Sequence, residues 1–187
     1  SFQAGNGGFV YWPGAGSGEA APWATNYAGH FLIEAEKLGY YVPPEMLGSW
    51  AAYQKSAAQS WQPGYGLTAI DQAYRLYTLA LAGTPELGAM NMLKETEKLD
   101  SASRWLLAAA YYLAGQHDVA PKIVGDNRME VANYSSPGYT YGSPLRDRAV
   151  ILLSLVTMRD YENASDMLKK ISQELSGSAW HSTQSVA

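Results

Sequence analysis

The sequence lacks cysteine altogether, although it is 187 residues long. This absence excludes disulfide bonds, a thiolate nucleophile, cysteine-bound zinc and iron–sulfur clusters within the chain. It leaves the cellular compartment open, because proteins of oxidising compartments can also lack cysteine.

Basic charge is scarce as well. Thirteen lysines and arginines stand against seventeen aspartates and glutamates, which gives a net charge of −4, and no stretch of the chain is rich in basic residues. Proteins that bind nucleic acid neutralise its phosphates with clusters of such residues. We therefore expect no nucleic-acid partner.

Long apolar runs are also missing. The longest run, WLLAAAYYLA at 105–114, has the length of a buried helix and is shorter than the roughly twenty residues of a membrane span. We expect no membrane insertion by this chain.

No secretion signal is recognisable either, and the chain opens inside a motif, so we expect a piece of a longer protein. With 47% hydrophobic and 16% charged residues, residues 1–187 are predicted to form a single domain.

Motifs for nucleophilic, phosphate-binding and dinucleotide chemistry are absent too. Three histidines, His30, His117 and His181, lie far apart in the sequence and without metal-ligand spacing. The sequence thus predicts neither a metal nor a cofactor, and no catalytic residue is assigned.

Carboxylates remain as candidates for a glycosidase acid pair. The candidates are Glu34 with Glu36, Glu95 with Glu97, and Asp71. Each has a structural interpretation: the first two point to different sides of a helix, and the second two lie in a solvated charged stretch. Asp71 has the i,i+4 spacing of an ion pair with Arg75.

The sequence does contain segments with the apolar spacing of helices, and glycine and proline residues separate these segments. Apolar spacing, caps and stop signals predict eight helices. Their expected ranges are about 23–38, 44–60, 67–82, 86–95, 101–114, 117–124, 144–158 and 161–176, and MEVANY at 129–134 is expected to form a brief extended segment.

The predicted helices alternate in character. The first, third, fifth and seventh are broadly apolar, whereas the others have a narrow apolar stripe or are short. Broadly apolar helices need cover on all sides, so the alternation predicts inner and outer helices. We predict an all-α fold, an α/α toroid built as a double barrel of helical hairpins, forming an incomplete ring of about four to five hairpins. The spacing also suits a helical solenoid.

Four sequence blocks carry a resemblance to a known family. They are GGFVYWPG at 7–14, PWATNYAGHFLIEAEKLGYYVP at 22–43, YGSPLRDRA at 141–149 and WHSTQ at 180–184. In this order the chain resembles the thioester domain of bacterial alpha-2-macroglobulins. The residues that match the family's motifs are Gly7, Gly8, Phe9, Trp12, Trp23, Thr25, Tyr141, Gly142, Ser143, Arg146, Asp147, Ser182, Thr183 and Gln184.

The resemblance implies a non-enzymatic role. Family members enclose a protease after it cleaves their bait region, and a Cys-x-Glu-Gln thioester, where present, then captures the protease covalently. The chain would be the C-terminal two-thirds of such a domain, with target proteases and the other domains of the same protein as partners. The thioester motif is expected upstream or is lost in this protein. The family implies a periplasmic or cell-envelope location, with a membrane anchor outside this chain.

Two motifs receive a structural interpretation. The loop GNGGFVYWPGAG at 5–16 is expected to be a plug whose aromatic rings pack over the end of the helical core. Gln3, Gly7 and Phe9 also match a repeat that ties helix ends together in terpene cyclases, but the aspartate-rich catalytic motif of those enzymes is missing. The start of the seventh helix, 141–147, is likewise expected to be structural, with Ser143 as its cap.

An alternative class stays open, namely a carbohydrate-active or glycan-binding α/α toroid. Rings of Tyr11, Trp12, Tyr139 and Tyr141 facing a groove beside an acid pair favour this alternative. Rings buried against neighbouring helices favour the protease-trap domain.

Overall fold

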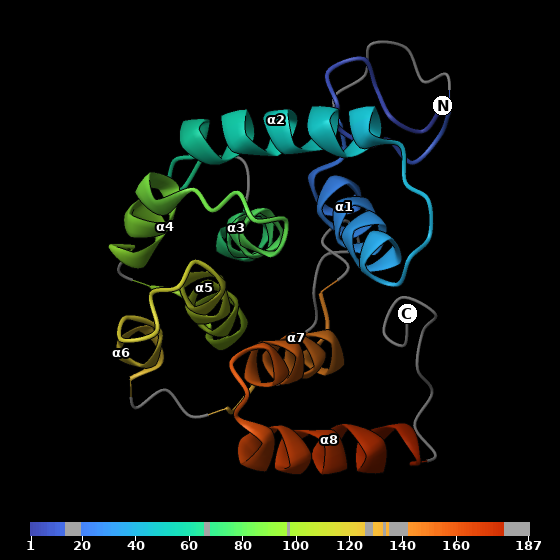
Figure 1. Cartoon of the computed structure of the whole chain (residues 1–187). Coiled ribbons are helices and arrows are strands. Elements are labelled where there is room, and N and C mark those ends of the chain that lie inside the picture. Colours follow the sequence, from blue (N-terminus) through green and yellow to red (C-terminus); the bar gives the residue numbers. More distant parts are fainter. Residues whose placement is uncertain are drawn as a thin grey trace. The chain divides into compact units, whose positions relative to one another are not determined.

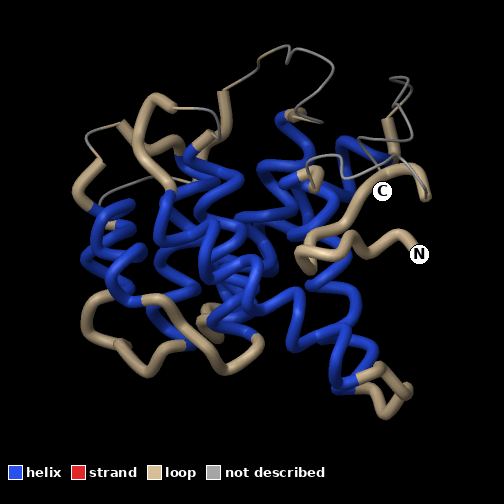
Figure 2. The backbone as a smooth tube through the Cα atoms, turned by 90° about the horizontal axis from the view of Figure 1, so that it is seen from above, coloured by secondary structure: helices blue, strands red, loops and turns tan. Residues whose placement is uncertain are grey.

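The computed structural model describes residues 1–13, 20–65, 68–96, 98–125, 129–132, 134 and 142–177. Within these ranges the regular structure is helical, with no strand and only isolated β-bridges, as Figure 2 shows. The predicted all-α class is therefore confirmed. The helices, labelled in Figure 1, are α1 (Pro22–Lys37), α2 (Pro44–Ser60), α3 (Ala69–Leu81), α4 (Leu87–Lys94), α5 (Ser101–Leu113), α6 (Ala120–Val124), α7 (Pro144–Thr157) and α8 (Tyr161–Leu175).

Close contacts divide the chain into two compact units. The first, Ser1–Glu97, contains α1 to α4, and the second, Lys98–Ala187, contains α5 to α8. Each unit contains the packed helical pairs that a toroid requires. That the two units together form one domain stays a prediction.

Helix α3 is the centre of the first unit. It packs against α1, α2 and α4, and every residue from 72 to 80 is buried. The prediction that this helix is covered on all sides is thus confirmed. Three of its buried residues, Gln72, Arg75 and Thr78, are nevertheless polar or charged. Buried polar groups need hydrogen-bond partners, so this helix constrains the helices around it.

Helix α1 does not have the all-round cover expected of an inner helix. Its buried residues form one stripe, Thr25, Asn26, Gly29 and Ile33. Tyr27 and Phe31, on the rest of the helix, are 55% and 67% exposed. The expectation was wrong for α1 because only the stripe that meets α2 and α3 is covered in this chain.

Helix α5 is the centre of the second unit, where it packs against α6 and α7, and α8 covers α7 (Figure 1). Residues 105–111 of α5 are buried, as their apolar run predicted. The core of this unit consists of Trp105, Leu145, Ile151, Leu155, Ala164, Met167 and Ile171. Helix α7 is buried along one side only, so it departs from the all-round cover predicted for it in the same way as α1.

Local signals explain where the helices begin and end. Ser143 accepts a backbone N–H group as the N-cap of α7, as predicted, and Asp100 does the same for α5. Prolines occupy the first turn of α1, α2 and α7, where the missing amide costs nothing. Gly39, Gly83 and Gly115 follow α1, α3 and α5 with positive φ, the conformation that ends a helix.

Gly29 permits the close approach of α1 and α2. A Cβ atom at this position would lie 2.1 Å from Cε2 of Trp50, whose side chain is fully buried. Helix packing at this distance requires glycine, because neither the indole nor the helix backbone has room to move.

Replacing Gly29 by alanine is therefore expected to lower the free energy of unfolding by about 1–3 kcal/mol, through overpacking. The matched control is Gly48→Ala on α2, where an added Cβ would meet nothing within 4 Å. That variant should be neutral or more stable, by up to about 1 kcal/mol of helix propensity. Urea unfolding followed by circular dichroism measures both. Equal stability of the two variants would contradict the close packing.

Candidate functional site

The hydroxyl of Thr25 joins the N-terminal loop to α1. It accepts the backbone N–H of Phe9 at 2.9 Å, and it lies 2.8 Å from the carbonyl oxygen of Ala21 and 3.3 Å from that of Phe9. The indole Nε1 of Trp50 donates to the carbonyl of Thr25 at 2.9 Å. A single buried threonine thus connects the loop, α1 and α2.

The glycine pair of the loop rests on α2. Gly7 has φ +94°, and a Cβ there would lie 2.1 Å from the carbonyl oxygen of Ser49. A Cβ on Gly8 would lie 2.2 Å from the Cβ of Ala20. Nε2 of Gln3 donates to the carbonyls of Gly7 at 3.0 Å and of Met46 at 2.9 Å. Positive φ and close approach together explain why two glycines stand at this point of the motif.

The aromatic rings of the loop differ in burial. Phe9 is buried with Ile33 and Trp50, as the plug prediction requires. Tyr11 and Trp12 are 45% and 76% exposed, so the prediction is wrong for them. Phe9 is held at the core by backbone hydrogen bonds on both sides of it, since Val10 donates to the carbonyl of Phe2 and Ala21 donates to the carbonyl of Phe9.

Trp23 and His30 meet α3 through one tyrosine. The rings of Trp23 and Tyr74 lie 5.2 Å apart between centroids, and the hydroxyl of Tyr74 lies 2.9 Å from Nδ1 of His30. Burial lowers the pKa of His30, although Glu34 works in the opposite direction. Nδ1 of His30 and the hydroxyl of Tyr74 thus form a hydrogen bond, and His30 has a structural partner in the first unit.

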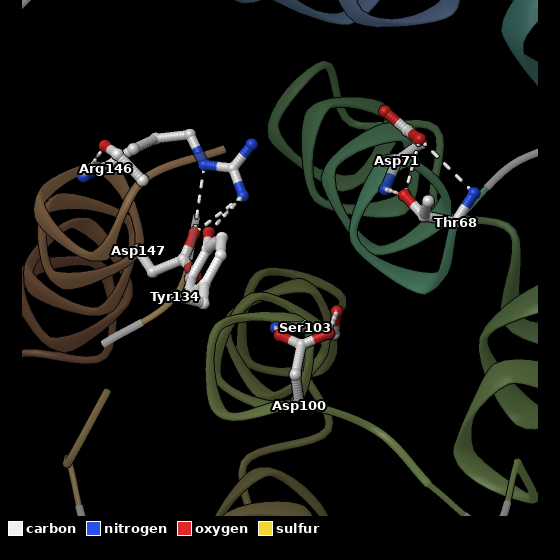
Figure 3. Close-up of polar contacts among 8 residues, drawn as sticks. Thr68, Asp71, Asp100, Ser103, Tyr134, Arg146 and Asp147 are labelled. Carbon is white, nitrogen blue, oxygen red and sulfur yellow. Dashed lines mark hydrogen bonds and ion pairs between the residues drawn. The ribbon is translucent and has the colours of Figure 1, made fainter. Parts of the chain in front are cut away.

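Arg75 is almost fully buried, at 1% exposure, and its partners are amide oxygens. Nε donates to Oε1 of Gln54 at 3.1 Å, and Nη1 donates to Oε1 of Gln72 at 2.6 Å. Nε2 of Gln54 in turn donates to Oδ1 of Asn26. The predicted Asp71–Arg75 ion pair is not formed. Asp71 instead completes the capping box of α3 with Thr68 (Figure 3), because that cap is the nearer partner of its carboxylate.

The start of α7 carries a second polar cluster, shown in Figure 3. Nε and Nη2 of Arg146 donate to Oδ1 of Asp147 at 2.9 and 2.7 Å. The hydroxyl of Tyr134 donates to Oδ2 of the same carboxylate at 2.8 Å. Burial, followed by this hydrogen bond, raises the pKa of Tyr134 to about 12. Sequence reasoning placed Arg146 and Asp147 here but missed Tyr134, which reaches them from an irregular segment.

The N-cap of α5 is a further acid with a structural partner. Asp100 accepts the backbone N–H of Ser103 at 2.9 Å and the hydroxyl of Ser103 at 2.7 Å (Figure 3). Its carboxylate also acts on Tyr134 and raises the pKa of that phenol. The start of α5 and the start of α7 are therefore close electrostatic neighbours within the second unit.

The remaining acidic candidates lie on the surface. Glu34 forms an ion pair with Lys37, and Glu95 forms one with Lys94. No group of three or more potential metal ligands occurs among the described residues, and no helix of this part of the chain is long and apolar enough to cross a membrane. Several predicted positions lie outside the described residues: Tyr141, Ser182, Thr183 and Gln184, together with Glu97, Tyr139 and His181.

Solved structures provide the comparison that identifies the fold. Native Escherichia coli alpha-2-macroglobulin, from domain MG7 to the C-terminus, matches 98% of this chain with a TM-score of 0.80 and 24% identity. The Escherichia coli protein activated by porcine elastase matches 98% with a TM-score of 0.82 and 24% identity. Salmonella alpha-2-macroglobulin reacted with methylamine matches 98% with a TM-score of 0.74 and 27% identity. The chain has the fold of a bacterial alpha-2-macroglobulin domain.

The resemblance seen in the sequence blocks is thereby confirmed over nearly the whole chain. No protein-family model matches the sequence, and no curated protein matches it. The chain spans 30%, 17% and 13% of the three solved alpha-2-macroglobulin chains. It therefore corresponds to a part of those proteins, and the activity of the whole belongs to a proposal.

Arg146→Ala is expected to destabilise the alpha-2-macroglobulin-like fold by about 1–3 kcal/mol, because Asp147 would lose its cationic partner in a largely buried position. Lys169→Ala is the control, since it breaks an exposed pair with Asp166 that contributes little. Thermal melting measures both variants. If Arg146→Ala melts like the parent, the cluster at the start of α7 is not structural.

His30 predicts a pH dependence of stability. Because burial holds its pKa below the ordinary 6.5, the unfolded chain takes up this proton first as the pH falls. The contribution of neutral, buried His30 to the free energy of unfolding is therefore fully present above pH 6.5. It is lost as the pH falls below 6.5. Urea unfolding at pH 7.5 and 5.0 should show a larger difference for the parent than for His30→Gln. If the free energy of unfolding changes equally between the two pH values in the parent and in His30→Gln, then protonation of His30 is not coupled to folding.

Proposed function

We propose that this chain is part of the thioester-bearing domain of a bacterial alpha-2-macroglobulin-like protease trap, and that it acts without catalysis of its own. The carrying observation is the similarity over 98% of the chain to alpha-2-macroglobulin structures, including the protein activated by elastase. A protein that a protease activates has that protease as its partner. Target proteases and the neighbouring domains of the same protein are therefore the partners we propose.

The described motif residues support a structural role. Gly7, Gly8, Phe9 and Thr25 fix the N-terminal loop on two helices, and Arg146 with Asp147 fixes the start of α7. We assign residues 1–187 to the C-terminal two-thirds of the thioester domain. We further propose a periplasmic or cell-envelope location, with an anchor elsewhere in the protein.

The covalent step would depend on residues outside this sequence. A Salmonella alpha-2-macroglobulin has been solved after reaction with methylamine. An amine is the kind of nucleophile that opens a thioester, but forming a thioester needs a cysteine, which this chain does not contain. Covalent capture therefore requires a Cys-x-Glu-Gln motif elsewhere in the full-length protein. The fold described here would position that motif.

A glycan-binding role is the second candidate, and one observation favours it. Tyr11 and Trp12 are exposed in the same loop, and exposed aromatic rings can stack on sugars. Indole fluorescence of the parent and of Trp12→Phe, titrated with bacterial-envelope oligosaccharides, tests it. A saturable change that is lost in the variant would favour glycan binding over the protease trap.

The protease-trap proposal predicts a size-dependent effect on an attacking protease. The full-length protein that contains this chain, mixed with elastase or trypsin, should lower the rate of casein cleavage by more than about tenfold. An enclosed protease cannot meet such a large substrate. Cleavage of a small chromogenic peptide should persist, since such a peptide diffuses into the cage.

The isolated 187-residue chain serves as the control and should leave both activities unchanged. Equal loss of casein and peptide cleavage would indicate a conventional active-site inhibitor and would contradict the trap. Turnover of polysaccharides or esters by the isolated chain, abolished in Asp71→Asn, would contradict the non-enzymatic assignment.

A further inference from the structure

Asn6 is directly followed by a glycine, and no other asparagine of the sequence is. In such a pair the backbone nitrogen of the glycine can attack Cγ of the asparagine, because glycine has no side chain to obstruct the approach. The bond from Cγ to Nδ2 breaks, ammonia leaves with the proton of the glycine amide, and a cyclic succinimide forms. Water then opens the ring at either carbonyl and gives aspartate or isoaspartate.

The two reacting residues differ in exposure. Asn6 is exposed, whereas Gly7 is buried. The N–H of Gly7 donates to the carbonyl of Ala4 at 2.9 Å, and Oδ1 of Asn6 accepts the N–H of Gly8 at 3.1 Å. The hydrogen bond to Ala4 must break before the nitrogen of Gly7 can lose its proton. The turn as it stands in the structure therefore opposes the reaction.

Helix α2 fixes the backbone around this pair. Nε2 of Gln3 donates to the carbonyls of Gly7 at 3.0 Å and of Met46 at 2.9 Å, so it ties the turn to the helix. The backbone of Gly7 also lies against the helix, since a Cβ there would be 2.1 Å from the carbonyl oxygen of Ser49. Rotation that brings the nitrogen of Gly7 to Cγ of the asparagine therefore requires the turn to leave α2.

Isoaspartate does not fit the same turn. Its main chain runs through the side-chain methylene, which adds a carbon atom between positions 6 and 7. The turn is closed by the hydrogen bonds from Gly7 to the carbonyl of Ala4 at 2.9 Å and from Ala4 to the carbonyl of Gly8 at 2.8 Å. Gly7 has no free space toward Ser49. A lengthened chain cannot keep these contacts, so the conversion detaches the loop from α2.

We propose that Asn6–Gly7 is a modification site whose reactivity is controlled by the docking of the N-terminal loop on α2. The pair is protected while the loop is docked. When the loop leaves α2, Gly7 attacks Asn6 and water opens the succinimide, and a chain with isoaspartate cannot dock again. Each opening of the loop that holds Phe9 in the core can therefore leave a permanent covalent change.

The test follows the modification in mildly alkaline buffer, by mass spectrometry and by enzymatic methylation of isoaspartate. An acetylated and amidated peptide of residues 4–9 gives the rate of the unprotected pair. The folded 187-residue chain should react at least about tenfold more slowly, because local opening must precede the attack. Gln3→Ala should react about fivefold faster than the parent, because the tie to Met46 is lost. Gln59→Ala, the matched control, removes an exposed hydrogen bond to Glu86 and should not change the rate.

Thermal melting separates the lengthened backbone from the added charge, and it checks that both glutamine variants are folded during the incubation. The isoaspartate form, isolated by chromatography, should melt below the parent. Asn6→Asp has the same charge with a normal backbone and should melt like the parent. The proposal is overturned if the folded chain reacts as fast as the peptide, if the two glutamine variants react alike, or if the isoaspartate form melts like Asn6→Asp.

Discussion

The first unit depends on how one buried cation is satisfied. Helix α3 is covered on all sides, so Arg75 is buried with it. Removing a guanidinium from water costs several kcal/mol unless hydrogen bonds replace the lost hydration. Gln54 of α2 supplies one such bond and is itself held by Asn26 of α1. Three helices are thereby fixed around a single charge, and the N-terminal loop rests on two of them.

The helices could be predicted because their signals are local. Asp100, Ser143 and Pro144 act within the first turn of the helix they begin, so their effect can be read from a few residues. The partner of Arg75 could not be predicted in this way. Its spacing from Asp71 suits an ion pair on a helix surface, but this helix has no exposed surface at Arg75. Which side of a helix is buried depends on residues far away in the sequence.

The residues of the candidate site could be predicted from the sequence, but their burial and contacts could not. The sequence blocks identified the glycine pair and Thr25, and the structure supplies their reasons, a positive φ and a buried hydroxyl shared between loop and helix. It also separates Phe9 from Trp12, which lie three residues apart and differ from buried to exposed. Aromatic composition cannot make that distinction, because the hydrogen bonds that fix Phe9 come from Ala21 and Thr25, which are more than ten residues away in the sequence.

The acids at the helix starts are engaged in holding the fold together. Asp71 closes the capping box of α3, Asp100 caps α5, and Asp147 holds Arg146 and Tyr134. Each of these carboxylates already accepts hydrogen bonds from its own unit. Such acids hold helix ends in place, because each carboxylate bridges the first turn of a helix to a second side chain or backbone group of the same unit.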